Sequence, residues 1–215
     1  LGLLKPDSGS VRVVGVEVTG LSEEDLRAVR LKVGMVFQEG ALFDSITVGE
    51  NVAYRLLEDG QLEEREIEEL VQEMLGFVGL GDFGHRMPSE LSGGQRRRVA
   101  VGRALVARPR IMLYDEPATG LDPITATTIT DLIVKVRDLD GVSSILVTHQ
   151  LRDAFNVART FMMKRGDGYE PSVVDDMNSL EGTEFLMLRE GHMVFEGATR
   201  ALQHCNDPYI REFLS

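Results

Sequence analysis

The sequence of 215 residues contains a single cysteine, Cys205, and no tryptophan. One thiol cannot form an internal disulfide, which excludes a small disulfide-stabilised fold and is typical of a reducing compartment. The sequence also lacks any run of about 18 apolar residues, the length that spans a bilayer, so we expect no direct membrane insertion. Its first ten residues have neither the basic region nor the apolar core of a signal peptide.

Basic residues are scarce relative to acidic ones. Lys and Arg number 23 against 35 Asp and Glu, which gives a formal net charge of −12. Nucleic-acid phosphates attract a basic surface, so this balance argues against general nucleic-acid binding. It does not exclude one nucleotide, because a single site needs local charge rather than global charge. Hydrophobic residues make up 43%, which predicts a globular chain of one large or two small domains.

Strands and helices alternate along the predicted chain. Short apolar runs at 32–37, 111–114 and 144–148 predict buried strands, and residues 11–18 read as β-rich and broken at Gly15. Helical patterns cover 48–57, 58–78, 124–139 and 151–158, and 184–197 reads as a hairpin. The polar, turn-rich stretch 166–183 predicts an insertion or long loop without an assigned function. This order predicts an α/β fold with a mainly parallel sheet.

Two adjacent carboxylates, Asp115 and Glu116, end the predicted strand that begins at Ile111. Neighbouring residues on a strand point in opposite directions. One carboxylate can therefore hold a hydrated Mg²⁺ while the other faces a water, as in the Walker B strand of P-loop NTPases.

A glycine-containing segment, Leu91-Ser92-Gly93-Gly94-Gln95, directly precedes an arginine-rich helix. The two glycines let the backbone approach another group closely, and the free N–H groups of a helix start favour a phosphate. Ser92 adds a hydroxyl donor.

Three further polar residues stand beside predicted strand ends. Asp122 follows the carboxylate pair, His149 closes the strand 144–148, and Gln38 ends the strand 32–37. Ligands bind at the carboxyl ends of parallel strands. A histidine there can donate to a phosphate oxygen, and a glutamine oxygen can ligate Mg²⁺.

In this order the motifs resemble those of ABC transporter ATPase subunits. Gln38 matches the Q-loop, Leu91–Gln95 the LSGGQ signature, Ile111–Glu116 the Walker B strand, Ala118–Pro123 the D-loop and His149 the H-loop. The resemblance implies a P-loop NTPase-like core at 1–38 and 99–160. It also implies a helical subdomain at 39–98 and a C-terminal segment at 161–215.

The resemblance also implies roles for these residues. Glu116 would polarise the attacking water, and Asp115 would hold Mg²⁺ through water. Gln38 would sense the metal and the γ-phosphate of ATP, and His149 would contact that phosphate. From a second subunit, Ser92, Gly93, Gly94 and Gln95 would close over the nucleotide, with Asp122 linking the two sites across the dimer interface.

One family motif is absent from the sequence. No G-x-x-x-x-G-K-[ST] occurs, and Gly2–Gly9 resembles the segment that follows this loop in the family. We therefore expect a sequence that begins just after the P-loop, without the first strands of the core. The 215 residues alone should bind ATP very poorly and hydrolyse it negligibly.

The segment from Phe37 to Val52 resembles the Q-loop region of Mla/Mce-type lipid transport ATPases, and residues 207–214 resemble their C-terminal tail. This resemblance implies phospholipid transport across a bacterial envelope. Its implied partners are a second ATPase subunit, a membrane permease and an Mce-type binding protein, and it implies a peripheral location at the cytoplasmic face.

Two alternatives stay open: another ABC importer or exporter, for amino acids or lipoproteins, and a non-transport ABC ATPase. Leu91 follows Gln38 by only 53 positions, which leaves no room for the long coiled coil of DNA-repair members and argues against the second alternative.

Overall fold

The structure is a computed structural model that describes residues 1–166, 168–174 and 182–214. Its N-terminal half comprises β1 (Arg12–Val13), β2 (Val16–Glu17), α1 (Glu23–Arg30), β3 (Val33–Val36), α2 (Val48–Asp59), α3 (Glu64–Phe77), the 3-10 turns η1 (Gly81–Phe83) and η2 (Pro88–Glu90), and α4 (Gly93–Leu105). The remainder comprises β4 (Ile111–Asp115), α5 (Pro123–Asp140), β5 (Ser143–Val147), α6 (Leu151–Arg159), β6 (Thr160–Arg165), β7 (Gly168–Val173), β8 (Glu184–Arg189), β9 (His192–Ala198), α7 (Thr199–Gln203) and α8 (Pro208–Leu214).

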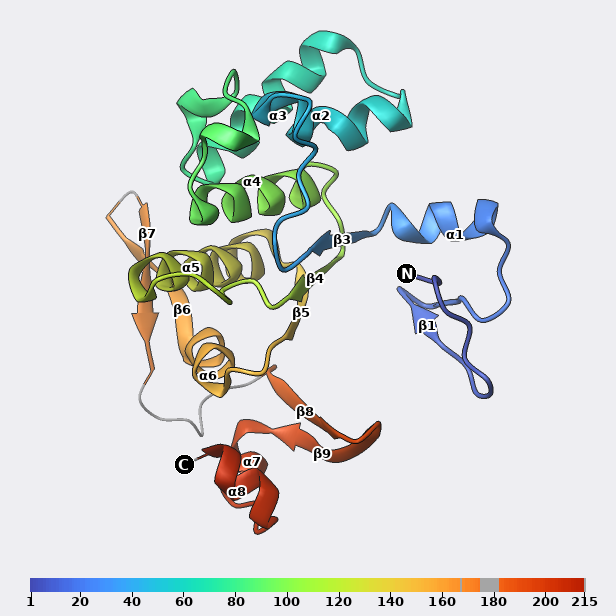
Figure 1. Cartoon of the computed structure of the whole chain (residues 1–215), viewed down its shortest axis with the longest axis vertical. Helices are drawn as coiled ribbons and strands as arrows, with labels where there is room; N and C mark the ends of the chain where they lie inside the picture. The colour runs from blue at the N-terminus through green and yellow to red at the C-terminus, as the bar shows by residue number, and fades with distance from the viewer. Residues whose placement is uncertain (167, 175–181, 215) are drawn as a thin grey trace.

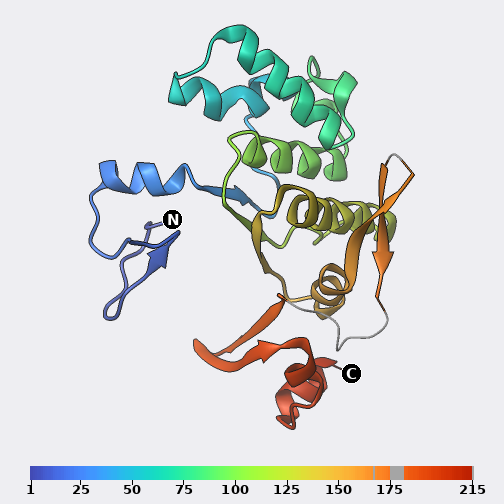
Figure 2. The same cartoon turned by 180° about the vertical axis from the view of Figure 1, so that it is seen from behind.

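A three-stranded parallel sheet forms the centre of the molecule, in the order β3-β4-β5. The α/β architecture with a parallel sheet is thereby confirmed. Helices cover the sheet, with α4 above it and α5 beside it, and α2 and α3 lie beyond α4 (Figure 1). Seen from behind, the N-terminal strands and the β8–β9 hairpin stand apart from this sheet (Figure 2).

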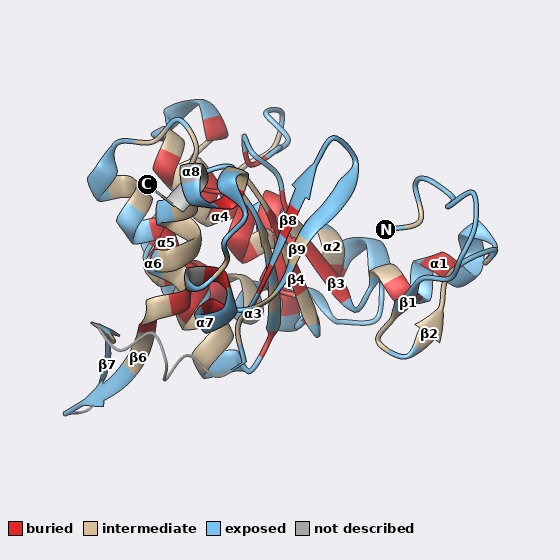
Figure 3. Cartoon of the chain, turned by 90° about the horizontal axis from the view of Figure 1, so that it is seen from below, coloured by how far each residue is buried: buried red, intermediate tan, exposed pale blue. Residues whose placement is uncertain are grey.

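One continuous hydrophobic core joins the sheet to the helical layer. Side chains from β3, β4, α2, α3, α4 and α5 all contribute to it, and Tyr114 and Val99 are fully buried. Buried residues gather along β3, β4 and α4, whereas β1 and β2 contain no buried residue and α1 contains only two, Leu26 and Val29 (Figure 3). The third strand was predicted to be buried, and this is wrong in part, because Ile145 and Val147 of β5 are more than half exposed.

Helix ends follow local capping chemistry. Thr47 and Glu50 form a reciprocal capping box at the start of α2, and Gly60 ends this helix in the left-handed conformation. The prediction of one helix over 58–78 is therefore wrong at its start, since α3 begins only at Glu64. Helix α1 was not predicted, although Ser22 caps it and three acidic residues fill its first turn.

Two antiparallel hairpins follow the core. The predicted hairpin at 184–197 is confirmed as β8 paired with β9. The stretch 166–183 is not simply a loop, because β7 pairs along its length with β6, which was also not predicted. Residues 167 and 175–181 of that stretch lie outside the described residues. Within the described ranges, no helix has the length and apolar character needed to cross a bilayer.

Candidate functional site

Register brings the predicted site residues to one edge of the sheet. Val36 at the end of β3 pairs with Tyr114, and Asp115 at the end of β4 pairs with Val147. Residues that follow these parallel strands therefore emerge at the same carboxyl edge. Gln38, Asp115, Glu116 and His149 all lie there, as their positions in the sequence predict.

Glu116 is the most heavily contacted carboxylate of this edge. Its Oε1 atom accepts from the backbone N–H of His149 at 2.8 Å and lies 2.7 Å from His149 Nδ1. Its Oε2 atom accepts from the Thr119 hydroxyl at 2.7 Å and from the Thr148 hydroxyl at 3.3 Å. An ionised carboxylate only accepts hydrogen bonds, so Nδ1 of His149 carries a proton in this contact.

These contacts set the charge state of Glu116. Burial raises the pKa of its carboxyl, but hydrogen bonds from His149 and Thr119 together lower that pKa more, so it lies below the ordinary value of 4.5. Glu116 is therefore ionised at neutral pH, the form in which a carboxylate can orient water or accept a proton.

Strand alternation does not separate Asp115 from Glu116. Strand β4 ends at Asp115, and Glu116 already belongs to the following turn, with φ at +47°. Its N–H still donates to the Val147 carbonyl at 2.9 Å. Glu116 is thus a left-handed residue, a conformation that a non-glycine residue adopts at a cost of about 1–2 kcal/mol.

The glycine-containing segment caps α4. The Ser92 hydroxyl accepts from the Gln95 N–H at 3.3 Å, and Gln95 Oε1 accepts from the Ser92 N–H at 2.8 Å. Both side chains thus stabilise the helix start, while Gly93 and Gly94 form its first two positions. The N-terminus of α4 is exposed at Ser92 and has the donor-rich polarity that suits an anion.

Asp122 caps α5 in a similar way. Its Oδ1 atom accepts from the N–H groups of Ile124 and Thr125, and its Oδ2 atom accepts from the Thr125 hydroxyl at 2.5 Å. The Thr125 hydrogen bonds hold the pKa of Asp122 below its usual range. Gly94 approaches this cap so closely that a Cβ atom there would overlap Thr125 Cγ2, whereas a Cβ on Gly93 would meet Leu121 at an ordinary 3.5 Å.

The oxygen atoms near Asp115 are of the ligand type that Mg²⁺ prefers. Gln38 and Asp115 offer an amide and a carboxylate oxygen at the same sheet edge, and Mg²⁺ prefers oxygen ligands, usually one or two from protein with the rest from phosphates and water. Across the described residues, no group of three or more His, Cys, Asp or Glu side chains could hold a metal alone. The residues therefore fit a metal that arrives with a phosphate ligand.

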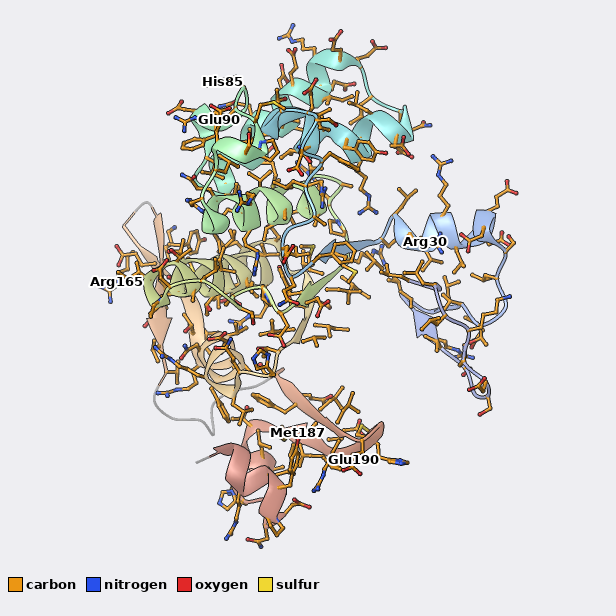
Figure 4. All side chains as sticks on the ribbon, viewed as in Figure 1. Arg30, His85, Glu90, Arg165, Met187 and Glu190 are labelled. Carbon is orange, nitrogen blue, oxygen red and sulfur yellow. The ribbon has the colours of Figure 1, made fainter. Side chains whose placement is uncertain are left out.

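Only some of the contacting residues were predicted. Of the four histidines, His149 is the one that contacts Glu116. His85 lies in the helical layer (Figure 4). Thr119, Thr148 and Arg97 were missed. Thr148 directly precedes His149, and Thr119 lies within the predicted D-loop segment 118–123, and these positions are the signals that could have identified them.

Comparisons with known proteins show the family that the chain resembles. The family described as "ABC transporter" matches residues 1–119. A probable ribonucleotide transport ATP-binding protein of Mycobacterium tuberculosis is 35% identical over 215 residues, covering 100% of this chain and 53% of that protein. A methionine import ATP-binding protein of Carboxydothermus hydrogenoformans is 42% identical over 177 residues, covering 82% and 52%.

A plant relative and a solved structure extend the comparison. The Arabidopsis thaliana chloroplastic protein named trigalactosyldiacylglycerol 3 is 37% identical over 229 residues, covering 99% of this chain and 59% of that protein. The chain thus spans little more than half the length of each of these relatives. A dimeric structure of the ATP-binding cassette MJ0796 with ADP and Pi, in a post-hydrolysis state, superposes with a TM-score of 0.72 at 28% identity, covering 92% of this chain and 76% of that one. The family match over more than half of the sequence and the shared fold together show that the chain belongs to the ABC transporter family, as part of its ATPase domain.

Proposed function

We propose that the chain forms part of an ATP-hydrolysing subunit that powers an ABC transporter. The observation that carries this proposal is the convergence of Glu116 and His149 at the carboxyl edge of the sheet. Glu116 is ionised and placed to orient a water for attack on the γ-phosphate. The water oxygen bonds to that phosphorus, the bond to the β,γ-bridging oxygen breaks, and the water proton passes toward Glu116.

The other residues of the edge have supporting roles in this proposal. Asp115 and Gln38 would hold Mg²⁺, which neutralises phosphate charge when bound. His149 would donate to the γ-phosphate. In the dimer, Ser92, Gly93, Gly94 and Gln95 of one subunit would cover the nucleotide held by the other, with Asp122 beside the interface. ABC ATPases generally work as dimers with membrane permease subunits, and this arrangement follows that pattern.

The division into subdomains stays part of the proposal. Residues 39–98 would form the helical subdomain and 1–38 with 99–160 the catalytic core. Helix α4 spans the boundary, since it runs from Gly93 to Leu105. A displacement of the signature segment would therefore reach the core directly.

The 215-residue chain should not work as an ATPase by itself. Its sequence holds no G-x-x-x-x-G-K-[ST] loop, whose backbone N–H groups and lysine would grip the phosphates. We expect calorimetric titration with Mg-ATP to give no saturable binding in the micromolar range. A micromolar dissociation constant for these residues alone would contradict this expectation. Turnover is therefore measured on the P-loop-completed protein, in which a G-x-x-x-x-G-K-[ST] segment precedes these residues.

Phospholipid or another hydrophobic molecule is the transported substrate that we propose. Support comes from the Phe37–Val52 segment and from the plant relative, whose name contains a galactolipid. Amino-acid import is the second candidate, because the methionine import relative has the higher identity of 42% over a shorter alignment. A neighbouring gene for an Mce-type binding protein would favour the lipid, and reconstituted transfer of labelled phospholipid against methionine uptake would decide between them.

An exposed aromatic pair beside the Q-loop is the permease-docking surface in this proposal. Fully buried Asn51 accepts from the Phe43 N–H at 2.8 Å and donates to the carbonyls of Phe43 and Thr47, which fixes the loop before α2. Phe43 then packs against Tyr54 with ring centroids 4.6 Å apart, and both remain about 40% exposed. Such rigid aromatic groups are frequent anchors of protein interfaces.

A charge on this pair should weaken the complex with the permease. Tyr54→Glu buries a carboxylate in an apolar contact, and we expect co-purification with the permease to fall by at least about tenfold, or ~1.4 kcal/mol. Tyr169→Glu on β7 is the matched control, since Tyr169 is also half exposed but lies on another hairpin. Equal losses in the two variants would show that Tyr54 is not at the permease interface.

A further inference from the structure

Arg97 is a buried cation on the signature helix whose hydrogen bonds all go to one turn. It is only 7% exposed. Its Nη1 donates to the carbonyl of Glu116 at 3.1 Å and to that of Pro117, and its Nη2 donates to the carbonyl of Thr119 at 3.0 Å. The planar guanidinium suits this task, because its donors are fixed in a fork.

The turn that Arg97 contacts contains Glu116, so its backbone conformation sets the direction of the Glu116 carboxylate. Glu116 is held at φ +47°, and its Thr119 contact depends on the same turn. Residues in sparsely populated backbone conformations persist only when their surroundings hold them. Three carbonyl contacts from one buried side chain, together with the Glu116 N–H bond to Val147, supply that restraint.

A second arginine of α4 makes the same kind of contact with a different turn. Arg103 donates to the carbonyl of Ala41 at 2.8 Å and to that of Gly40 at 2.9 Å. This turn also contains a left-handed non-glycine residue, since Ala41 has φ at +47°. Helix α4 therefore holds the turns that follow both β3 and β4, each through one arginine.

We propose that Arg97 is the positioning residue for Glu116, linking the signature helix to the carboxylate of its own subunit. The expected effect on ATP hydrolysis rests on the proposed function. The restraint of the Glu116 turn by Arg97 does not, because it rests on the hydrogen bonds alone. When α4 shifts as the signature segment engages the partner's nucleotide, Arg97 carries that shift to the Glu116 turn. Through Arg97, the occupancy of one nucleotide site would thereby influence the carboxylate of the other.

Amide hydrogen exchange of the 215-residue chain tests the positioning without nucleotide. The reporters are the N–H groups of Glu116, bonded to Val147, and of His149, bonded to the Glu116 carboxylate. Arg97→Met keeps the side-chain length and removes the donors. We expect exchange at both reporters to accelerate about tenfold, while the Gly40 N–H, bonded to Phe37, keeps its rate.

Arg103→Met is the matched control with the opposite expected pattern. It should accelerate the Gly40 N–H and leave Glu116 and His149 unchanged. Arg97→Lys retains a cation with donors on one nitrogen, so it should accelerate the two reporters by a smaller factor and serves if Arg97→Met does not fold. Unchanged reporters in both Arg97 variants, or the same pattern in the Arg97 and Arg103 variants, would overturn the proposal.

Measurement of kcat separates the positioning role of Arg97 from the proposed catalytic role of Glu116. In the P-loop-completed protein, Arg97→Met should lower kcat about tenfold with the ATP KM within twofold, because ground-state binding does not use Glu116. The same substitution in a Glu116→Gln background should have no further effect on kcat. Accelerated exchange with an unchanged kcat would leave Arg97 as the restraint of the turn and would contradict the role of Glu116 instead.

Discussion

Glu116→Gln should abolish turnover in the P-loop-completed protein while leaving ATP binding intact. Gln keeps the shape of the side chain and an oxygen that can accept from the His149 N–H, so the turn should persist. It cannot act as a base, and loss of general-base assistance typically costs about 10²–10⁴-fold in rate. Phosphate release should therefore fall by at least about 100-fold. Size-exclusion chromatography should show an ATP-bound dimer that accumulates because hydrolysis no longer separates the subunits.

Glu190→Gln provides the matched control for this experiment. Glu190 is also a glutamate in the left-handed conformation, with φ at +51°, but it lies at the tip of the β8–β9 hairpin (Figure 4). Its side chain is 83% exposed. This variant should hydrolyse ATP at the parental rate. If Glu116→Gln did so too, Glu116 would not be the residue that activates water.

Gly94→Ala should destabilise the fold without any nucleotide. The new methyl group would overlap Thr125 Cγ2, and Thr125 cannot rotate away freely because its hydroxyl donates to Asp122 at 2.5 Å. Overpacking of this kind costs about 1–3 kcal/mol of unfolding free energy. Urea denaturation of the 215-residue chain measures it. Gly93→Ala is the control, and because its methyl group has room, it should be neutral or stabilise the helix by up to about 1 kcal/mol.

A second substitution can remove the clash and keep the cap. Thr125→Ser deletes the Cγ2 methyl group but retains the hydroxyl that donates to Asp122. Gly94→Ala combined with Thr125→Ser should therefore recover most of the stability that Gly94→Ala loses. Failure of this rescue would mean that the cost of Gly94→Ala has another origin than the contact with α5. Success would show that Gly94 is small for packing within one subunit, whatever it contacts in the dimer.

The positions of the predicted site residues followed from strand ends alone. Gln38, Asp115 and His149 each stand just beyond or at the end of an apolar run, and parallel register brings such residues together. Because the strands were predictable from composition and length, the edge was predictable too. The family resemblance then assigned these residues to motifs, but it did not predict the hydrogen bonds among them.

The features of the site that could not be predicted from the sequence are those that depend on tertiary contacts. The left-handed conformation of Glu116 and the burial of Arg97 arise only when α4 packs beside the turn after β4. Strand β6 escaped prediction because its partner β7 lies in a polar, turn-rich stretch. The break between α2 and α3 was predictable in principle, since Gly60 is a common helix terminator.

The left-handed backbone at Glu116 also has a genetic consequence. Single-base changes in a glutamate codon can produce Asp, Gly, Ala, Val, Lys or Gln. Gly tolerates positive φ freely and Asp more readily than most residues, whereas a β-branched Val does not. The Val, Gly, Asp and Gln alleles at this codon should therefore divide into two classes. Val should yield a less stable product of lower abundance, so that its allele is recessive to a parental copy. Gly, Asp and Gln should yield folded, inactive subunits that pair with parental ones, and such alleles should be dominant.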